Sequence, residues 1–226
     1  MRYLLFSVFM LITGVLLAQN KALSKIPVVG KTIDAFIPAG YDTLAVAQGD
    51  LNKDKIDDYV LVLQSVNEKN TDPSVVDTDS LPARILVVIF KKANQYVLGV
   101  KTDKAIMCRY CGGVFGEPFD YVIIEKGVLN IHHYGGSTWR WSETHKFRYQ
   151  KNEFYLIGET SYLYWNVSNC EALGEFAGTH YKDVNFITGD YEEKKVSDEG
   201  CKLLVNKKGK QKILPLKKLT AFSLEN

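Results

Sequence analysis

The stretch Tyr121-Val-Ile-Ile-Glu-Lys-Gly-Val-Leu-Asn-Ile-His-His-Tyr134 contains the pattern that decides the fold. Apolar side chains recur at every second position on either side of Lys126-Gly127, and period two is the spacing of a strand with one buried face. Glycine tolerates the positive φ that a tight two-residue turn requires. The stretch therefore predicts two antiparallel strands, 121–125 and 128–134, joined as a hairpin.

The same period recurs along the chain, and no long stretch keeps the 3.6-residue repeat of an amphipathic helix. Further strands are predicted at 44–48, 58–64, 84–91, 95–101, 142–150 and 153–159, with tight turns at Ala93-Asn94 and Lys151-Asn152. The sequence predicts a mainly β fold with little helix. Its strands form an antiparallel meander in two sheet-like groups, sandwich-like or blade-like, before and after a 108–119 loop. A surface loop is predicted at 67–82, and the segment after Tyr162 is predicted to be loop-rich.

The N-terminus has the composition of a secretory signal peptide. A basic start, Met1-Arg2-Tyr3, precedes an apolar run at 4–18 that is shorter than the roughly 20 residues of a membrane span. We predict a signal peptide at 1–19 and a single mainly β domain at 20–226, with possible sub-units 20–107 and 108–226. The mature chain is expected to be exported, periplasmic or extracellular, and to have no transmembrane segment.

Charge gives little indication of a partner. The formal net charge is +2, so no overall basic field predicts a nucleic-acid partner. Lysines are concentrated near the C-terminus, at Lys202, Lys207, Lys208, Lys210, Lys212, Lys217 and Lys218. Such a run is typical of a solvated face or a protected edge strand, and a surface for polyanions or membranes is the alternative.

An even number of cysteines in an exported chain predicts disulfides. Four cysteines allow three pairings, of which we favour Cys108 with Cys111 and Cys170 with Cys201. A redox role for the first pair is an alternative. A zinc site formed by that pair with His132 or His133 is another.

Residues 50–58 place oxygen side chains at the first, third, fifth and ninth positions, the spacing that surrounds a hard cation such as calcium. An EF-hand loop has flanking helices, glycine at its sixth position and glutamate at its twelfth. Here the predicted flanks are strands, the sixth residue is Lys55 and the twelfth is Leu61. A polar turn without a metal is the alternative to a calcium site.

Gly49-Asp-Leu-Asn-Lys-Asp-Lys-Ile-Asp-Asp58, followed by an apolar strand, resembles the calcium loops of FG-GAP and VCBS repeats. That resemblance implies a structural calcium ion held by side-chain oxygens of Asp50, Asn52, Asp54 and Asp58 and by the carbonyl of Ile56. It covers one repeat, whereas a propeller needs several blades, so it implies a local site and not a propeller.

A second cluster, at 130–141, combines aromatic residues, histidines and an arginine around a glycine turn. We predict His132, Tyr134, Trp139, Arg140 and Trp141 as ligand-binding candidates. Strand alternation separates His132 from His133, so both cannot ligate one metal ion. Trp139 and Trp141 share a face, where a core stack is the alternative role, and Arg140 points the other way.

The blocks 108–119, 132–141 and 185–189 are similar to a family of exported bacterial β-proteins of uncharacterised activity, which implies export but no reaction. Two hypotheses follow. The favoured one is a non-enzymatic domain, stabilised by calcium and disulfides, that binds a protein or a glycan. The alternative is a small secreted hydrolase of cell-wall or glycan material that uses Glu117, His132, Glu143 and His145; no pair among these residues is selected by spacing.

Overall fold

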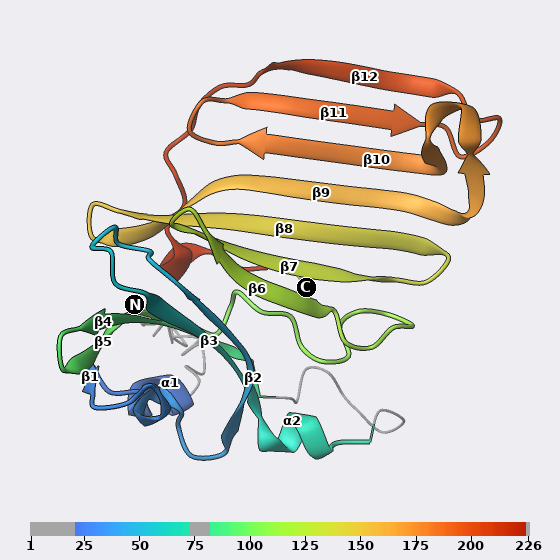
Figure 1. Cartoon of the computed structure of the whole chain (residues 1–226). Coiled ribbons are helices and arrows are strands. Elements are labelled where there is room, and N and C mark those ends of the chain that lie inside the picture. Colours follow the sequence, from blue (N-terminus) through green and yellow to red (C-terminus); the bar gives the residue numbers. More distant parts are fainter. Residues whose placement is uncertain (1–20, 73–81, 225–226) are drawn as a thin grey trace, which may run out of the picture.

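The computed structural model describes residues 21–72 and 82–224 of the chain. Strands make up 56% of the structure and helices 10%, which confirms the predicted mainly β class. The two predicted groups are a five-stranded antiparallel sheet, which we call the small sheet, and a seven-stranded one, the large sheet (Figure 1). The predicted signal peptide at 1–19 lies outside the described residues.

The strand order is β1-β5-β4-β3-β2 in the small sheet and β12-β11-β10-β9-β8-β7-β6 in the large sheet. The strands are β1 (Val29–Gly30), β2 (Tyr41–Gly49), β3 (Asp58–Ser65), β4 (Ile85–Lys92), β5 (Gln95–Thr102), β6 (Phe119–Glu125), β7 (Val128–Gly136), β8 (Trp139–Gln150), β9 (Glu153–Cys170), β10 (Glu175–Asn185), β11 (Asp190–Val196) and β12 (Leu203–Lys210). The helices are α1 (Lys21–Lys25), η1 (Ile33–Phe36), α2 (Val66–Asn70), η4 (Glu171–Leu173) and η5 (Leu219–Ala221). None of the described helices has the length and apolar character needed to cross a membrane.

The central strands of the small sheet, β3 and β4, are buried on both faces, which explains their nearly continuous apolar sequences. One set of side chains, including Val60 and Val88, packs toward the large sheet. The alternate set, including Leu63 and Ile85, packs against Ile26 and Phe36 of the N-terminal segment.

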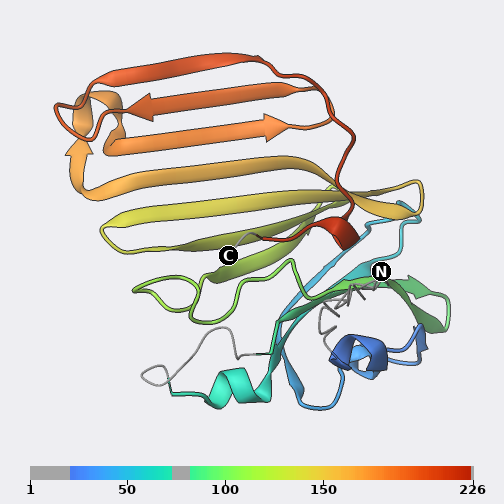
Figure 2. The same cartoon turned by 180° about the vertical axis from the view of Figure 1, so that it is seen from behind.

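One hydrophobic core joins the two sheets. It contains Leu129, Ile131 and Phe147 of the large sheet together with Leu219 and Phe222 of the C-terminal segment. We call the face of the large sheet that carries Leu129 and Ile131 its inner face, and the opposite side its outer face. The C-terminal segment crosses the inner face (Figure 2).

The three predicted turns join β4 to β5, β6 to β7 and β8 to β9, which confirms the predicted hairpins. Both residues of two of these turns have positive φ: 52° and 77° at Lys126 and Gly127, and 51° and 62° at Lys151 and Asn152. Such dihedrals match the right-handed twist of the flanking strands.

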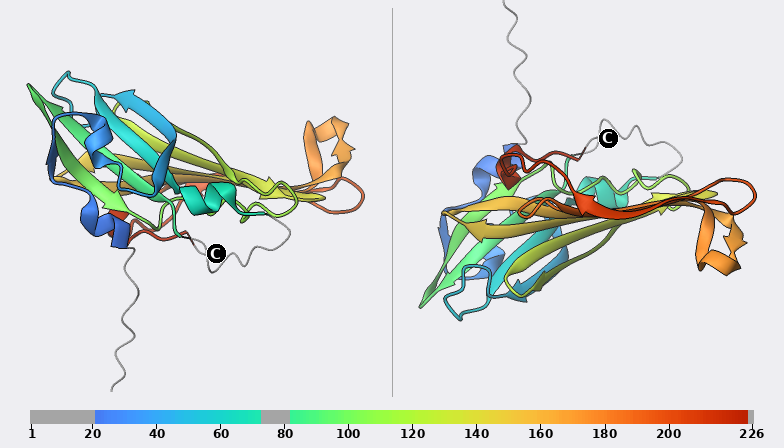
Figure 3. Two further views of the ribbon diagram at one scale, coloured as in Figure 1. Left: turned by 90° about the horizontal axis from the view of Figure 1, so that it is seen from below. Right: turned by 90° about the horizontal axis from the view of Figure 1, so that it is seen from above.

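The loop-rich character predicted for the segment after Tyr162 is wrong. Strand β9 continues to Cys170, and β10, β11 and β12 extend the large sheet beyond the region covered by the small sheet (Figure 1). Figure 3 shows the large sheet edge-on, with the orange connection between β9 and β10 projecting from one end of it. Most side chains of β11 and β12 are half-buried or exposed, and opposite charges pair across strands, as Lys208 does with Glu192. Within β11 and β12 only Val196 belongs to a buried apolar cluster, a small one with Cys170 and Ala177, so the period-two signal is weak. The lysine-rich segment includes edge strand β12.

Both favoured disulfides are present. Cys108 and Cys111 are bonded within one turn, with their Cα atoms 5.2 Å apart, and Cys170 and Cys201 are bonded at 5.5 Å. The second bond connects the end of β9 to the turn between β11 and β12. With Cys108 and Cys111 oxidised, the zinc alternative has no thiolate ligands.

Candidate functional site

Strand alternation divides the predicted ligand-binding residues between the two faces of the large sheet. Arg140 lies opposite Tyr164 on the outer face, and Tyr134 and His132 share that face. Trp141 lies opposite Gly135 on the inner face, the side to which Trp139 also points. The structure therefore groups Tyr134 with Arg140 and separates both from the two tryptophans.

Six aromatic side chains form a connected group on the outer face, which we call the aromatic row. Tyr162 stacks on Tyr164 with ring centroids 4.8 Å apart, and Tyr164 stacks on Phe176 at the same distance. Tyr181 meets Tyr162 edge-on at 6.2 Å. The row is completed by Tyr134, whose hydroxyl is hydrogen-bonded to that of Tyr164, and by Phe115, 5.7 Å from Tyr134.

The register of the strands creates this group. Four residues on adjacent strands lie opposite one another, each paired with the next: Tyr134 on β7, Ser142 on β8, Tyr162 on β9 and Tyr181 on β10. Cross-strand neighbours have Cβ atoms about 4.5–5.5 Å apart, close enough for rings to touch. The small side chain of Ser142 leaves room between the two tyrosines on either side of it.

The row lies on a face that is not buried by the rest of the fold. The small sheet and the C-terminal segment pack on the inner face of the large sheet, and β2 contacts its β6 edge. The segment 112–117 lies over one end of the row, where Phe115 contacts Tyr134. Burial and the hydrogen bond to Tyr134 raise the pKa of Tyr164 to about 12, so its hydroxyl stays protonated.

A cleft of about 350 Å³ opens at this end of the row. Its lining comes from three parts of the chain: Val114 and Phe115 of the 112–117 segment, Ser137, Thr138 and Arg140 of the β7–β8 hairpin, and Asn166 of β9. The guanidinium carbon of Arg140 lies 3.6 Å from the centroid of the Phe115 ring. Two buried polar atoms here, Nη1 of Arg140 and Oδ1 of Asn166, have no hydrogen-bond partner.

Backbone hydrogen bonds hold the 112–117 segment against the large sheet. Gly112 donates its N–H to Gly116 at 2.8 Å and accepts one from Gly136 at 2.9 Å. Gly112 has little space for a side chain, because a Cβ there would lie 2.6 Å from the oxygen of Gly116. The cleft wall that carries Phe115 is thus tied to the end of β7.

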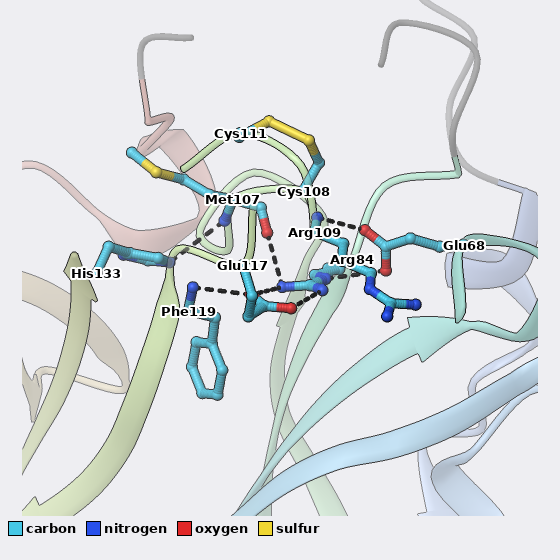
Figure 4. The surroundings of a disulfide bond; sticks show 9 residues. All are labelled: Glu68, Arg84, Met107, Cys108, Arg109, Cys111, Glu117, Phe119 and His133. Carbon is cyan, nitrogen blue, oxygen red and sulfur yellow. Dashed lines mark hydrogen bonds and ion pairs between the residues drawn. A yellow bond between two sulfur atoms is a disulfide. The ribbon is translucent and has the colours of Figure 1, made fainter. Parts of the chain in front are cut away.

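A buried ion cluster anchors the same segment (Figure 4). The side chain of Arg84 is fully buried and donates two hydrogen bonds of 2.6 Å to the carboxylate of Glu117. Its Nε donates to Glu68, also fully buried, at 2.9 Å. Glu68 in turn accepts the backbone N–H of Arg109, beside Cys108, at 2.7 Å. Glu117 is therefore held by Arg84 and is not an available acid.

The position of Glu68 corrects the loop predicted at 67–82. Helix α2 occupies its first residues because Ser65 caps the helix, accepting the N–H of Asn67 at 3.1 Å, and because Glu68 binds Arg84 inside the fold. Residues 73–81 of the predicted loop lie outside the described residues.

The tryptophans on the inner face form packing contacts. Trp139 stacks on Trp165 with centroids 6.5 Å apart and is 39% exposed, while Trp141 packs over Gly135. The rings lie at the end of the sheet far from the shared core, so their surface remains partly accessible.

The two adjacent histidines have different surroundings. His132 stacks on Tyr121 at 4.8 Å on the outer face and hydrogen-bonds Thr144. His133 is fully buried, and its Nε2 accepts the N–H of Met107 at 3.3 Å. Burial lowers the pKa of His133 to about 3, so this ring is neutral.

Glu143 and His145 share the inner face with Glu159, whose carboxylate lies 3.8 Å from Nε2 of His145. Burial raises the pKa of both glutamates and lowers that of His145 to about 4. The four residues of the hydrolase hypothesis therefore lie in three places: Glu117 with Arg84, His132 on the outer face, and Glu143 with His145 inside.

The acidic loop between β2 and β3 is wound around its own side chains. Asp50 accepts backbone N–H groups of Lys53 and Lys55 at 2.6 and 2.9 Å, and Asn52 accepts that of Asp54 at 2.9 Å. Lys55 has φ of 68°, the left-handed conformation that glycine adopts most readily. The backbone thus makes the turn without the glycine.

Asp58, the ninth residue of the loop, is fully buried and accepts N–H groups of Leu51 and Lys91 at 3.0 and 3.2 Å. Burial raises the pKa of its carboxyl group. The side-chain oxygens of Asp50, Asn52 and Asp54 and the carbonyl of Ile56 remain the more exposed part of the predicted ligand set. Among the described residues no group of three or more His, Cys, Asp and Glu side chains is arranged to hold a metal ion.

Sequence reasoning did not identify Phe115, Tyr162, Tyr164, Phe176, Tyr181 or Asn166 as site residues. The signal for two of them was present, since Tyr162 and Tyr164 have the spacing of one strand face, but the predicted strand ended at Glu159. Comparison of the chain with protein-family models, curated proteins and solved structures found no match, so its function is inferred from its own geometry.

Proposed function

We propose that this chain is an exported β domain, stabilised by calcium and disulfides, that binds a glycan along the aromatic row. The observation that carries the proposal is the row itself, six connected rings on the sheet face opposite the shared core. Large apolar groups on such a face indicate a binding surface.

The composition of the row suits a glycan ligand. Four of its six members are tyrosines, which offer a flat apolar ring and a hydroxyl at its edge. A pyranose has the matching chemistry, because its C–H groups pack on ring faces and its hydroxyls form hydrogen bonds. A protein ligand remains the second class, because tyrosines are also enriched in protein–protein interfaces.

Calcium has a structural role in this proposal. The loop at 50–58 joins two strands of the small sheet, and its carboxylates already converge on a tight turn. A cation there would neutralise the clustered charges of Asp50 and Asp54 and hold the hairpin. The disulfides of the structure are consistent with an exported protein, because such bonds persist in oxidising compartments.

Affinity electrophoresis against a panel of soluble neutral and acidic polysaccharides tests the proposal. We expect at least one polysaccharide to retard the protein and Tyr164→Ala to abolish the retardation. Tyr191→Ala is the matched control, because Tyr191 is a half-buried tyrosine of the same sheet whose side chain points to the inner face. Glycan binding at the row would be refuted if no polysaccharide retards the protein. It would also be refuted if the retardation survives in Tyr164→Ala.

A further inference from the structure

The cleft beside Arg140 has two polar atoms that lack partners and differ in what they need. Nη1 of Arg140 is a cationic donor, and Oδ1 of Asn166 is an acceptor. Both are buried, and burying an unpaired polar or charged group is unfavourable. Because both side chains line the cleft, they are placed to bind a ligand that enters it.

Arg140 is fixed in a way that selects a planar anion. The Phe115 ring covers one face of the guanidinium at 3.6 Å, and such a stack leaves the in-plane N–H groups at its edge free. None of the ion pairs among the described residues includes Arg140. A carboxylate accepts two parallel hydrogen bonds from that edge, which is the preferred geometry for arginine.

Asn166 adds a second requirement for the chemical groups of the ligand. A carboxylate is acceptor-only and cannot satisfy Oδ1, so the ligand must also present an O–H or N–H donor close to its carboxylate. The exposed hydroxyls of Ser137 and Thr138 line the same cleft and add groups that can donate or accept. A neutral sugar would accept a hydrogen bond from Arg140 but leave its charge uncompensated, and a simple carboxylate would leave Oδ1 of Asn166 without a donor.

The size and position of the cleft point to a sugar unit at the end of a chain of such units. Its volume of about 350 Å³ is at the lower end of the roughly 300–1,000 Å³ range of small-molecule sites. Tyr164 lies opposite Arg140 on the neighbouring strand, so the cleft opens directly onto the aromatic row. A ligand that fills the cleft can therefore continue across Tyr164 and Tyr162.

We propose that the cleft binds a uronic acid unit, with the sugar carboxylate on Arg140 and an adjacent hydroxyl donating to Asn166. The glycan ligand is then acidic, an inference that rests on the proposed glycan-binding function. A uronic acid has its carboxylate and a ring hydroxyl on neighbouring carbons, which is the combination that the two unpartnered atoms require.

Isothermal titration calorimetry of the purified protein tests this inference with oligogalacturonate, alginate and hyaluronan oligosaccharides in calcium-free buffer. The decisive comparison is between oligogalacturonate and its methyl ester, which keeps the ring and hydroxyls and loses the charge. We expect at least one uronate oligosaccharide to bind, and the oligogalacturonate ester to bind at least tenfold more weakly than the acid if galacturonate is the unit recognised. For every uronate bound, Arg140→Gln should weaken binding by a similar factor and Asn166→Ala should weaken it too.

Arg148→Gln is the matched control, because Arg148 lies on the same strand and contacts Gln150 away from the cleft. Binding of a uronate that is unchanged in Arg140→Gln would overturn the inference, as would failure of all three uronates. If neutral glycans bind and only Tyr164→Ala abolishes their binding, the uronate inference fails and the proposed function stands. If no glycan of either kind binds, both fail, and binding of an acidic peptide instead would identify a protein ligand.

Discussion

Replacing Arg84 with methionine is the sharpest test of how the structure is held together. The arginine side chain is fully buried and donates four hydrogen bonds, one to Glu68, one to the carbonyl of Met107 and two to Glu117. Methionine fills similar volume but removes the charge. Glu117 is 37% exposed and can regain water, whereas Glu68 is fully buried and cannot.

The main cost of Arg84→Met is therefore the uncompensated carboxylate of Glu68. Removing one partner of a buried ion pair typically costs about 3–5 kcal/mol. Adding Glu68→Gln should recover part of this loss, because the double variant leaves no buried charge. Since Glu117 anchors the segment that carries Phe115, the single variant should also weaken any ligand that binds at Arg140.

Urea unfolding followed by tryptophan fluorescence measures these differences. The control is Lys69→Met, which breaks an exposed ion pair with Asp42 at 3.1 Å and should cost no more than about 1 kcal/mol. A loss for Arg84→Met no larger than that of the control, or no recovery when Glu68→Gln is added, would refute the assignment of Glu68 as a buried charge that depends on Arg84.

Three further predictions concern the calcium loop, the buried histidines and the disulfides. If the loop binds calcium with an affinity of about 0.1–1 mM, 10 mM calcium should stabilise the protein by about 1.4–2.7 kcal/mol in thermal unfolding. Magnesium should not reproduce this, and an equal shift in Asp50→Asn would contradict the site. Burial lowers the pKa of His133 to about 3 and of His145 to about 4, whereas both titrate near 6.5 when unfolded. The unfolded state then binds more protons between pH 6.5 and 4, so each histidine should reduce stability by about 1.4 kcal/mol per unit as pH falls. His133→Gln should remove one such contribution in urea unfolding at pH 7.5, 6.0 and 5.0, and an unchanged pH dependence would count against it. Removing Cys170–Cys201, whose cysteines are 31 residues apart, should cost about 3–4 kcal/mol, more than removing Cys108–Cys111 at a separation of 3. Comparison of the two double Cys→Ser variants by urea unfolding checks this order.

Local patterns in the sequence were sufficient for much of the fold. The turn at Lys126-Gly127 and the alternation around it predicted a hairpin that the structure contains, because tight-turn dihedrals and a period-two apolar face are properties of neighbouring residues. The disulfide between Cys108 and Cys111 could also be predicted from the local sequence, because two intervening residues allow the ring to close. The buried strands β3 and β4 were recognisable from their apolar composition alone.

The candidate site was decided by the tertiary structure. Tyr134, Arg140, Tyr164 and Asn166 lie on three strands, and their proximity depends on the register between strands, which no single segment encodes. The half-exposed end of β9 and the strands after it bury little apolar surface, so the sequence there lacked the signal that identified the earlier strands. Sequence alone thus determined the hairpins, the class and the two disulfides, and it predicts export. Long-range pairing decided the rest, because it placed Phe115 over Arg140 and left two polar atoms without partners.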